Sequence, residues 1–72
     1  MVYSTADAVY NNYMNDATNL LDEIALVRQL AVQCHCDAAR RNTTYAKRLV
    51  EHGELVAARA ALNAASAALD AM

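Results

Sequence analysis

Apolar side chains recur along the first half of the chain at alternating steps of three and four residues. This spacing places them on one face of an α-helix. At about 100° per residue, polar side chains such as Asn15, Asp22 and Gln29 gather on the opposite face. The apolar stripe consists of Tyr3, Ala6, Tyr10, Tyr13, Ala17, Leu20, Ile24, Val27, Ala31, Cys34 and Ala38. The pattern therefore predicts a long amphipathic helix.

We expect this helix to extend from about residue 5 to about residue 51. Gly53 marks its end, because glycine readily adopts the left-handed conformation of a helix C-cap. Residues 42–44, Asn-Thr-Thr, are weak helix formers and permit a kink or a break. Tyr45 and Leu49 nevertheless continue the apolar stripe. The prediction is therefore one continuous or slightly kinked helix.

A second, shorter helix is predicted over about residues 54–71. Large and small side chains alternate along its seam, which allows close helix packing: Leu55, Ala58, Leu62, Ala65, Leu69 and Met72. Residues 20–32 are apolar around most of the helix circumference, which is typical of a helix with more than one neighbour. We predict a single all-α domain, residues 1–72, that forms a helical hairpin within an oligomeric helix bundle.

The residues around Gly53 resemble a tetratricopeptide-type helical hairpin in their spacing of small and large side chains. The resemblance covers about the last 34 residues. It rests on Ala46, Leu49, Gly53, Ala58, Leu62 and Ala65. Asn42 and Asp70 stand where the family carries an aromatic residue and a closing proline, and no second repeat precedes them. The resemblance implies a helix–turn–helix arrangement only.

Composition supports the all-helical prediction and limits the core. The chain has 72 residues, of which 57% are hydrophobic, with one glycine and no proline. So few turn-forming residues do not suit a small β fold. Many of the hydrophobic residues are alanines, which bury little apolar area each. The net charge of −2 argues against a generally basic surface that seeks phosphate.

The same counts bear on location. Cys34 and Cys36 are too close in sequence for a relaxed disulfide, and free thiols suit a reducing compartment. No signal peptide is visible, and the uncharged stretch at residues 60–69 is too short to span a bilayer. We expect an intracellular protein that is soluble or part of an assembly, in the cytoplasm or a virion.

Few residues suggest chemistry. Cys34, His35 and Cys36 are potential metal ligands, but on a helix the two thiols point about 200° apart, so no metal site is predicted. The stripe instead places Cys34 in the core and Cys36 at the surface. No nucleophile–base spacing is present. We therefore predict a protein that is not an enzyme and has no cofactor and no small-molecule substrate.

The principal basic cluster is a candidate anion or nucleic-acid contact. It consists of Arg40, Arg41, Lys47 and Arg48. Residues seven apart align on a helix, so these side chains lie along one side with phosphate-binding potential. The alternatives are a solvated face or ion pairs with acidic groups of a neighbouring chain.

Assembly is the favoured function. A short second helix cannot cover a long first one, so the N-terminal tyrosines need another partner. The predicted protein interface consists of Tyr3, Tyr10, Tyr13, Leu20, Leu21, Ile24, Val27, Leu30, Leu55, Leu62 and Leu69. We expect a structural subunit of a homo-oligomer, virion, filament or multi-subunit machine. The alternative is a small regulatory protein that binds nucleic acid through the basic cluster or inhibits a partner by helix-in-groove docking. A peripheral membrane role ranks third.

Overall fold

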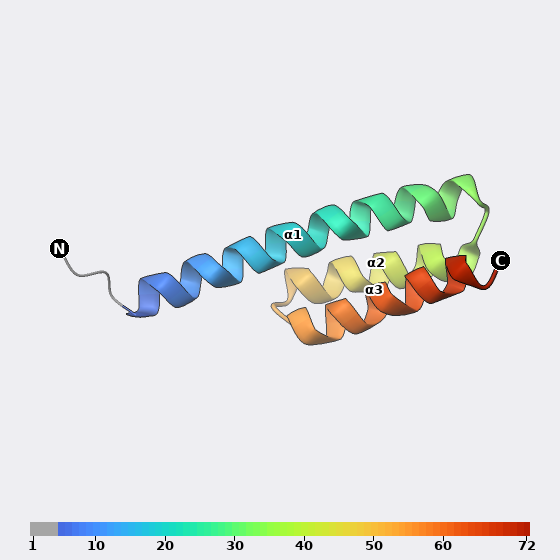
Figure 1. Ribbon diagram of the computed structural model, residues 1–72. Coiled ribbons are helices and arrows are strands. Elements are labelled where there is room, and N and C mark those ends of the chain that lie inside the picture. Colours follow the sequence, from blue (N-terminus) through green and yellow to red (C-terminus); the bar gives the residue numbers. More distant parts are fainter. Residues whose placement is uncertain (1–4) are drawn as a thin grey trace.

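The computed structural model describes the backbone of residues 5–72 and the side chains of residues 15–72. Within this part the chain forms three α-helices and no strand: α1 (Thr5–Gln33), α2 (Asp37–Glu51) and α3 (Leu55–Asp70). Helices α2 and α3 form an antiparallel hairpin, and α1 lies along it and extends well beyond its closed end (Figure 1). The all-helical prediction is confirmed. The prediction of two helices is wrong, because the long first helix is divided.

The division lies at residues 34–36. His35 adopts a left-handed conformation with φ of 55°. The amide of Cys36 donates to the Ala31 carbonyl at 2.9 Å, and the amide of His35 donates to the Val32 carbonyl at 3.2 Å. These two bonds form a Schellman motif, which satisfies the last carbonyls of α1. The prediction of a single helix over residues 5–51 is therefore wrong, because the chain reverses at this turn. The turn was not predicted because it contains neither a glycine nor a proline.

The turn also shifts the buried face of the chain by one residue. The continued stripe predicted Ala38, Tyr45 and Leu49 toward the core. In α2 the buried residues are instead Ala39, Thr43, Ala46 and Val50. Tyr45 is 55% exposed. The register changes because α2 has its own axis after the turn, so the periodicity of α1 no longer sets its orientation.

Gly53 ends α2 as expected. It has a φ of 78°. The amide of Glu54 donates to the Leu49 carbonyl at 2.8 Å, and the Gly53 amide donates to the Val50 carbonyl at 3.0 Å. This is a second Schellman motif, here with the glycine that its left-handed position favours.

The core is thin and rich in alanine. Helices α2 and α3 pack most extensively, and α1 contacts α2 more than α3. Ala39, Ala46, Ala58 and Ala65 are fully buried, so the axes of α2 and α3 can approach closely. Leu62 fills the space between them and is 2% exposed. The predicted burial of Ala58, Leu62 and Ala65 along the last helix is confirmed.

The larger apolar side chains come from α1. Leu20 and Ile24 are each 3% exposed and complete a cluster with Val50 of α2 and Leu62 of α3. A second cluster near the first turn contains Ala31 and Cys36 with two alanines of the hairpin. Each cluster joins all three helices, so α1 is held to the hairpin at two levels.

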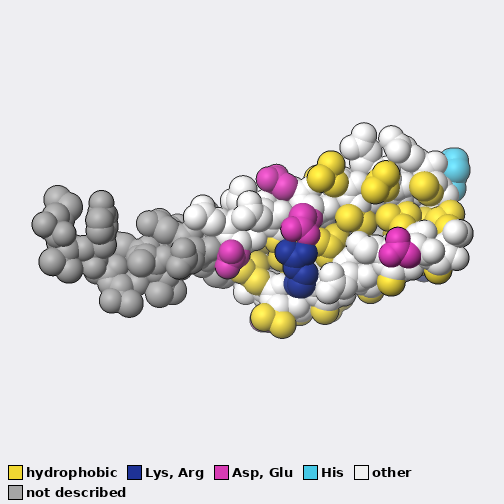
Figure 2. Space-filling view, in the orientation of Figure 1, with side chains coloured by type: hydrophobic (Ala, Val, Ile, Leu, Met, Phe, Trp, Pro, Cys, Tyr) yellow, Lys and Arg dark blue, Asp and Glu magenta, His cyan; other side chains and the backbone are white. Residues whose placement is uncertain are grey.

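An ion pair joins α1 to α3 at the surface. Arg59 donates through Nη1 to Oε2 of Glu23 at 2.5 Å and through Nη2 to Oε1 at 3.3 Å. This hydrogen bonding lowers the pKa of the Glu23 carboxyl and raises the pKa of Arg59. On the described part of the face in Figure 2, basic side chains occupy one patch that adjoins acidic ones.

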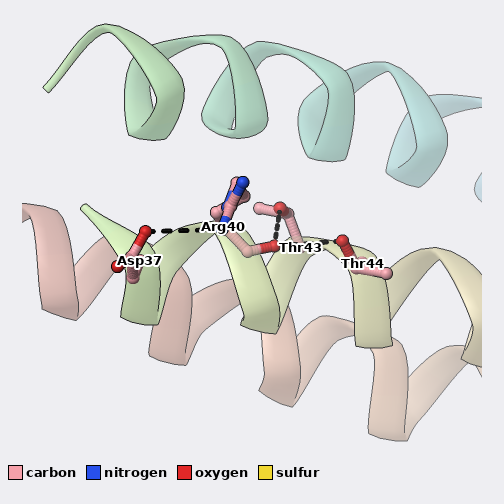
Figure 3. A network of polar contacts seen from close by, with 4 residues as sticks. All are labelled: Asp37, Arg40, Thr43 and Thr44. Carbon is pink, nitrogen blue, oxygen red and sulfur yellow. Dashed lines mark hydrogen bonds and ion pairs between the residues drawn. The ribbon is translucent and has the colours of Figure 1, made fainter. Parts of the chain in front are cut away.

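Residues 42–44 lie inside α2, and the helix is unbroken there. The hydroxyls of Thr43 and Thr44 both donate to the Arg40 carbonyl, at 2.7 and 3.2 Å (Figure 3). Thr43 is completely buried, and this bond satisfies its hydroxyl. The break that these weak helix formers permitted is absent, and the two threonine hydroxyls bond back to a carbonyl of the same helix.

Candidate functional site

Basic side chains gather along the groove between α1 and α2. The chain has six Lys and Arg residues. Four of them, with Thr44 and Tyr45, line one hollow of about 310 Å³: Arg28, Arg40, Arg41 and Arg48. A neighbouring hollow of about 280 Å³ is lined by Lys47 and again by Arg28, together with Leu21, Ile24 and Ala25. The remaining basic residue, Arg59, is paired with Glu23 on the α1–α3 side.

The α2 helix places its arginines on one edge of the groove. Arg41, Tyr45 and Arg48 are separated by steps of four and three residues, so they form a row along that edge. Arg40 and Thr44 form a second, parallel pair one residue earlier. The buried residues of α2 lie beside these rows, so the rows border the face of α2 that packs against α1.

Arg28 completes the groove from the opposite helix. It follows Val27, which packs against both core clusters, and it therefore lies at the edge of the buried face of α1. It lines both hollows. Because α2 runs antiparallel to α1 after the turn at residues 34–36, Arg28 lies opposite the α2 arginines.

The groove carries more positive charge than its neighbours neutralise. Among the described side chains, Arg40 has the one ion pair of this group, with Asp37 at 3.4 Å (Figure 3). Both partners are more than half exposed, so water screens this pair. Four guanidinium groups therefore share one hollow, and among the described side chains only Arg40 has a carboxylate partner within 4 Å. Like charges so placed repel each other and attract an anion.

The structure brings together most of the basic cluster predicted from sequence. Arg40, Arg41 and Arg48 line the same hollow, and Lys47 lines the adjoining one. Arg28 and Tyr45 were not part of the cluster predicted from sequence. In a continuous helix Arg28 would lie about 18 Å from Arg40 along the axis, so no pattern in the sequence connects them.

The residues predicted as a protein interface are divided among three environments. Leu20, Ile24 and Leu62 lie in the core of the chain itself. Val27, Leu55 and Leu69 are partly buried against it. Leu21 and Leu30 are exposed, by 37% and 51%. The predictions for Tyr3, Tyr10 and Tyr13 concern side chains outside the described residues.

The cysteines are placed opposite to the expectation. Cys34 is exposed and Cys36 is buried, and both are free thiols. The reason is the turn: Cys36 follows the left-handed residue and packs with Ala31, as the residue after such a cap commonly does. Among the described side chains, no three His, Cys, Asp or Glu residues form a possible metal-binding group.

In comparisons with known proteins, no family model, no curated protein and no solved structure matches this chain. Among the helices that the structure describes, none combines the length and the hydropathy needed to cross a membrane.

Proposed function

We propose that this chain is a non-enzymatic structural subunit that assembles through α1, with further copies of itself or within a larger complex. The observation that carries the proposal is the unequal length of the helices. Helix α1 has 29 residues, whereas α2 and α3 have 15 and 16. At 1.5 Å per residue these lengths are about 43 Å against about 23 Å.

The projecting part of α1 supports assembly because most protein helices are stabilised by packing. Among the described side chains of α1, Ala17 is the first that packs against the core shared with α2 and α3. Residues 5–16 precede it and span about 18 Å of helix. Most of the backbone of this segment extends beyond the closed end of the hairpin (Figure 1). A second molecule lying along this segment would provide the packing that the hairpin does not reach.

Exposed apolar side chains on the described part of α1 support the same proposal. Leu26 and Leu30 are 64% and 51% exposed and lie one turn apart on the same side of the helix. Val32 is 54% exposed. Paired leucines on one helix side are a suitable contact for another helix.

The test is the oligomeric state of the purified full-length chain, measured by sedimentation velocity from about 1 μM to about 500 μM, since association is concentration-dependent. We expect an oligomer that Leu26→Gln combined with Leu30→Gln shifts toward monomer. Val56→Gln is the matched control, because Val56 is 89% exposed and belongs to α3 and not to α1. A wild-type chain that stays monomeric over the whole range would refute self-association, and co-purification of a stoichiometric partner would then be required.

A further inference from the structure

We propose that the groove between α1 and α2 binds single-stranded nucleic acid, with its arginines on the phosphates and Tyr45 stacked under a base. This activity is separate from assembly. It rests on the four arginines and the exposed tyrosine that line one hollow.

The arginines point to a phosphate-bearing ligand. Four of the chain's six basic residues are arginines in this one hollow, in a protein whose net charge is −2. A guanidinium presents a planar fork of donors that matches phosphate oxygens in pairs. Within the described part of the chain, the groove offers these forks one weak carboxylate partner, Asp37. The donors of Arg28, Arg41 and Arg48 are therefore available to a ligand.

Tyr45 distinguishes nucleic acid from other anions. Tyr45 is 55% exposed although it stands between Arg41 and Arg48 on the same helix edge. Exposed aromatic rings among basic side chains are the usual platforms of proteins that bind single strands, because every base has a face that can stack. A base offers the ring a flat face for stacking, which a lipid phosphate or a carboxylate group does not.

The size of the hollow favours a single strand over a duplex. At about 310 Å³ it accommodates a nucleotide or so, and the second hollow continues it past Lys47. Both hollows lie in a groove between two helices. A flexible strand can follow such a groove with its backbone, whereas a stiff duplex touches only its rim.

The experiment is fluorescence anisotropy of the full-length chain with a labelled single-stranded RNA of about 16 nucleotides, the same sequence as single-stranded DNA, and the DNA duplex, at about 50 mM salt. We expect both single strands to bind more tightly than the duplex, and the affinity to fall steeply with added salt. Arg41→Gln combined with Arg48→Gln weakens binding at least about tenfold and reduces the salt slope by about two.

Two matched variants separate the groove from general electrostatics. Arg59→Gln removes one positive charge from the other side of the molecule and changes the affinity less than about twofold, whereas Arg41→Gln or Arg48→Gln alone, which removes the same charge from the groove, weakens binding more. Tyr45→Ala weakens binding about tenfold, and Tyr45→Phe restores it, because stacking needs the ring and not the hydroxyl. Circular dichroism spectra of all variants are compared with that of wild type, so that unfolding is not mistaken for a loss of binding.

Four results would overturn the proposal. The first is the absence of binding at about 50 mM salt, and the second is a loss of affinity with Arg59→Gln equal to that of the groove variant. The third is a Tyr45→Ala variant that binds like wild type. The fourth is displacement of the labelled strand by polyglutamate as effectively as by unlabelled oligonucleotide. The last result would identify the groove as a site for an acidic protein segment. A fifth result that would overturn the proposal is equal binding to vesicles containing phosphatidylserine, which would assign the groove to a membrane surface.

Discussion

The left-handed residue between α1 and α2 provides a sharp test of the three-helix structure. His35 has a φ of 55°, which a glycine adopts without steric cost and a residue with a Cβ does not. We therefore compare His35→Gly with His35→Ala. Since both substitutions remove the imidazole, their difference reports the backbone conformation at this position.

The magnitude follows from the two conformations. A left-handed L-residue costs about 1–2 kcal/mol, and glycine loses about 0.5–1 kcal/mol more backbone entropy on folding than alanine. In the observed turn, His35→Gly should thus be more stable than His35→Ala by about 1 kcal/mol. In a continuous helix through residue 35 the order reverses, with alanine favoured by about 1 kcal/mol. The two structures differ by about 2 kcal/mol in this comparison.

The measurement is urea unfolding followed by circular dichroism at 222 nm, with variants compared at equal m-values. Ala60→Gly is the control for a helix interior, because Ala60 is exposed in the middle of α3. We expect it to lose about 1 kcal/mol. If His35→Ala proves more stable than His35→Gly by a similar amount, residue 35 is helical and the division of the first helix is refuted.

Three further predictions concern the core, the surface ion pair and the thiols. Leu62→Ala should lower the free energy of unfolding by about 2–5 kcal/mol, because the side chain is 2% exposed. Val56→Ala, at an 89% exposed position, should change it by less than about 0.5 kcal/mol. Comparable losses for the two variants in urea unfolding would contradict the described core. The lowered pKa of Glu23 means that its stabilising contribution is present above the pKa of the unfolded chain and disappears as the pH falls through the lower folded value. The difference in urea midpoint between wild type and Glu23→Gln should therefore shrink from about pH 7 to about pH 3, and a constant difference would contradict the pairing. A thiol reagent should modify exposed Cys34 within minutes and buried Cys36 only upon unfolding, as peptide mass spectrometry can show, and equal rates would argue against the turn.

The candidate groove was partly predictable. Arg40, Arg41 and Arg48 lie seven or eight residues apart or adjacent, so helical periodicity alone places them on one side. Tyr45 was assigned to the core, because the apolar stripe of the first helix was extended through it. Arg28 could not be connected with this cluster, because the turn that brings α1 against α2 contains neither glycine nor proline.

Helical periodicity, the abundance of alanine and the single glycine are local properties, and they sufficed to determine an all-helical chain with a turn at Gly53 and a buried Ala58–Leu62–Ala65 seam. The division at residues 34–36 was decided by tertiary packing. Placing Leu20, Ile24 and Ala31 on the hairpin buries apolar surface that one long helix would leave in water. That gain outweighs the left-handed strain at His35, a cost of about 1–2 kcal/mol. The same folding back shifted the register of α2, exchanged the environments of the two cysteines and placed Arg28 opposite the α2 arginines.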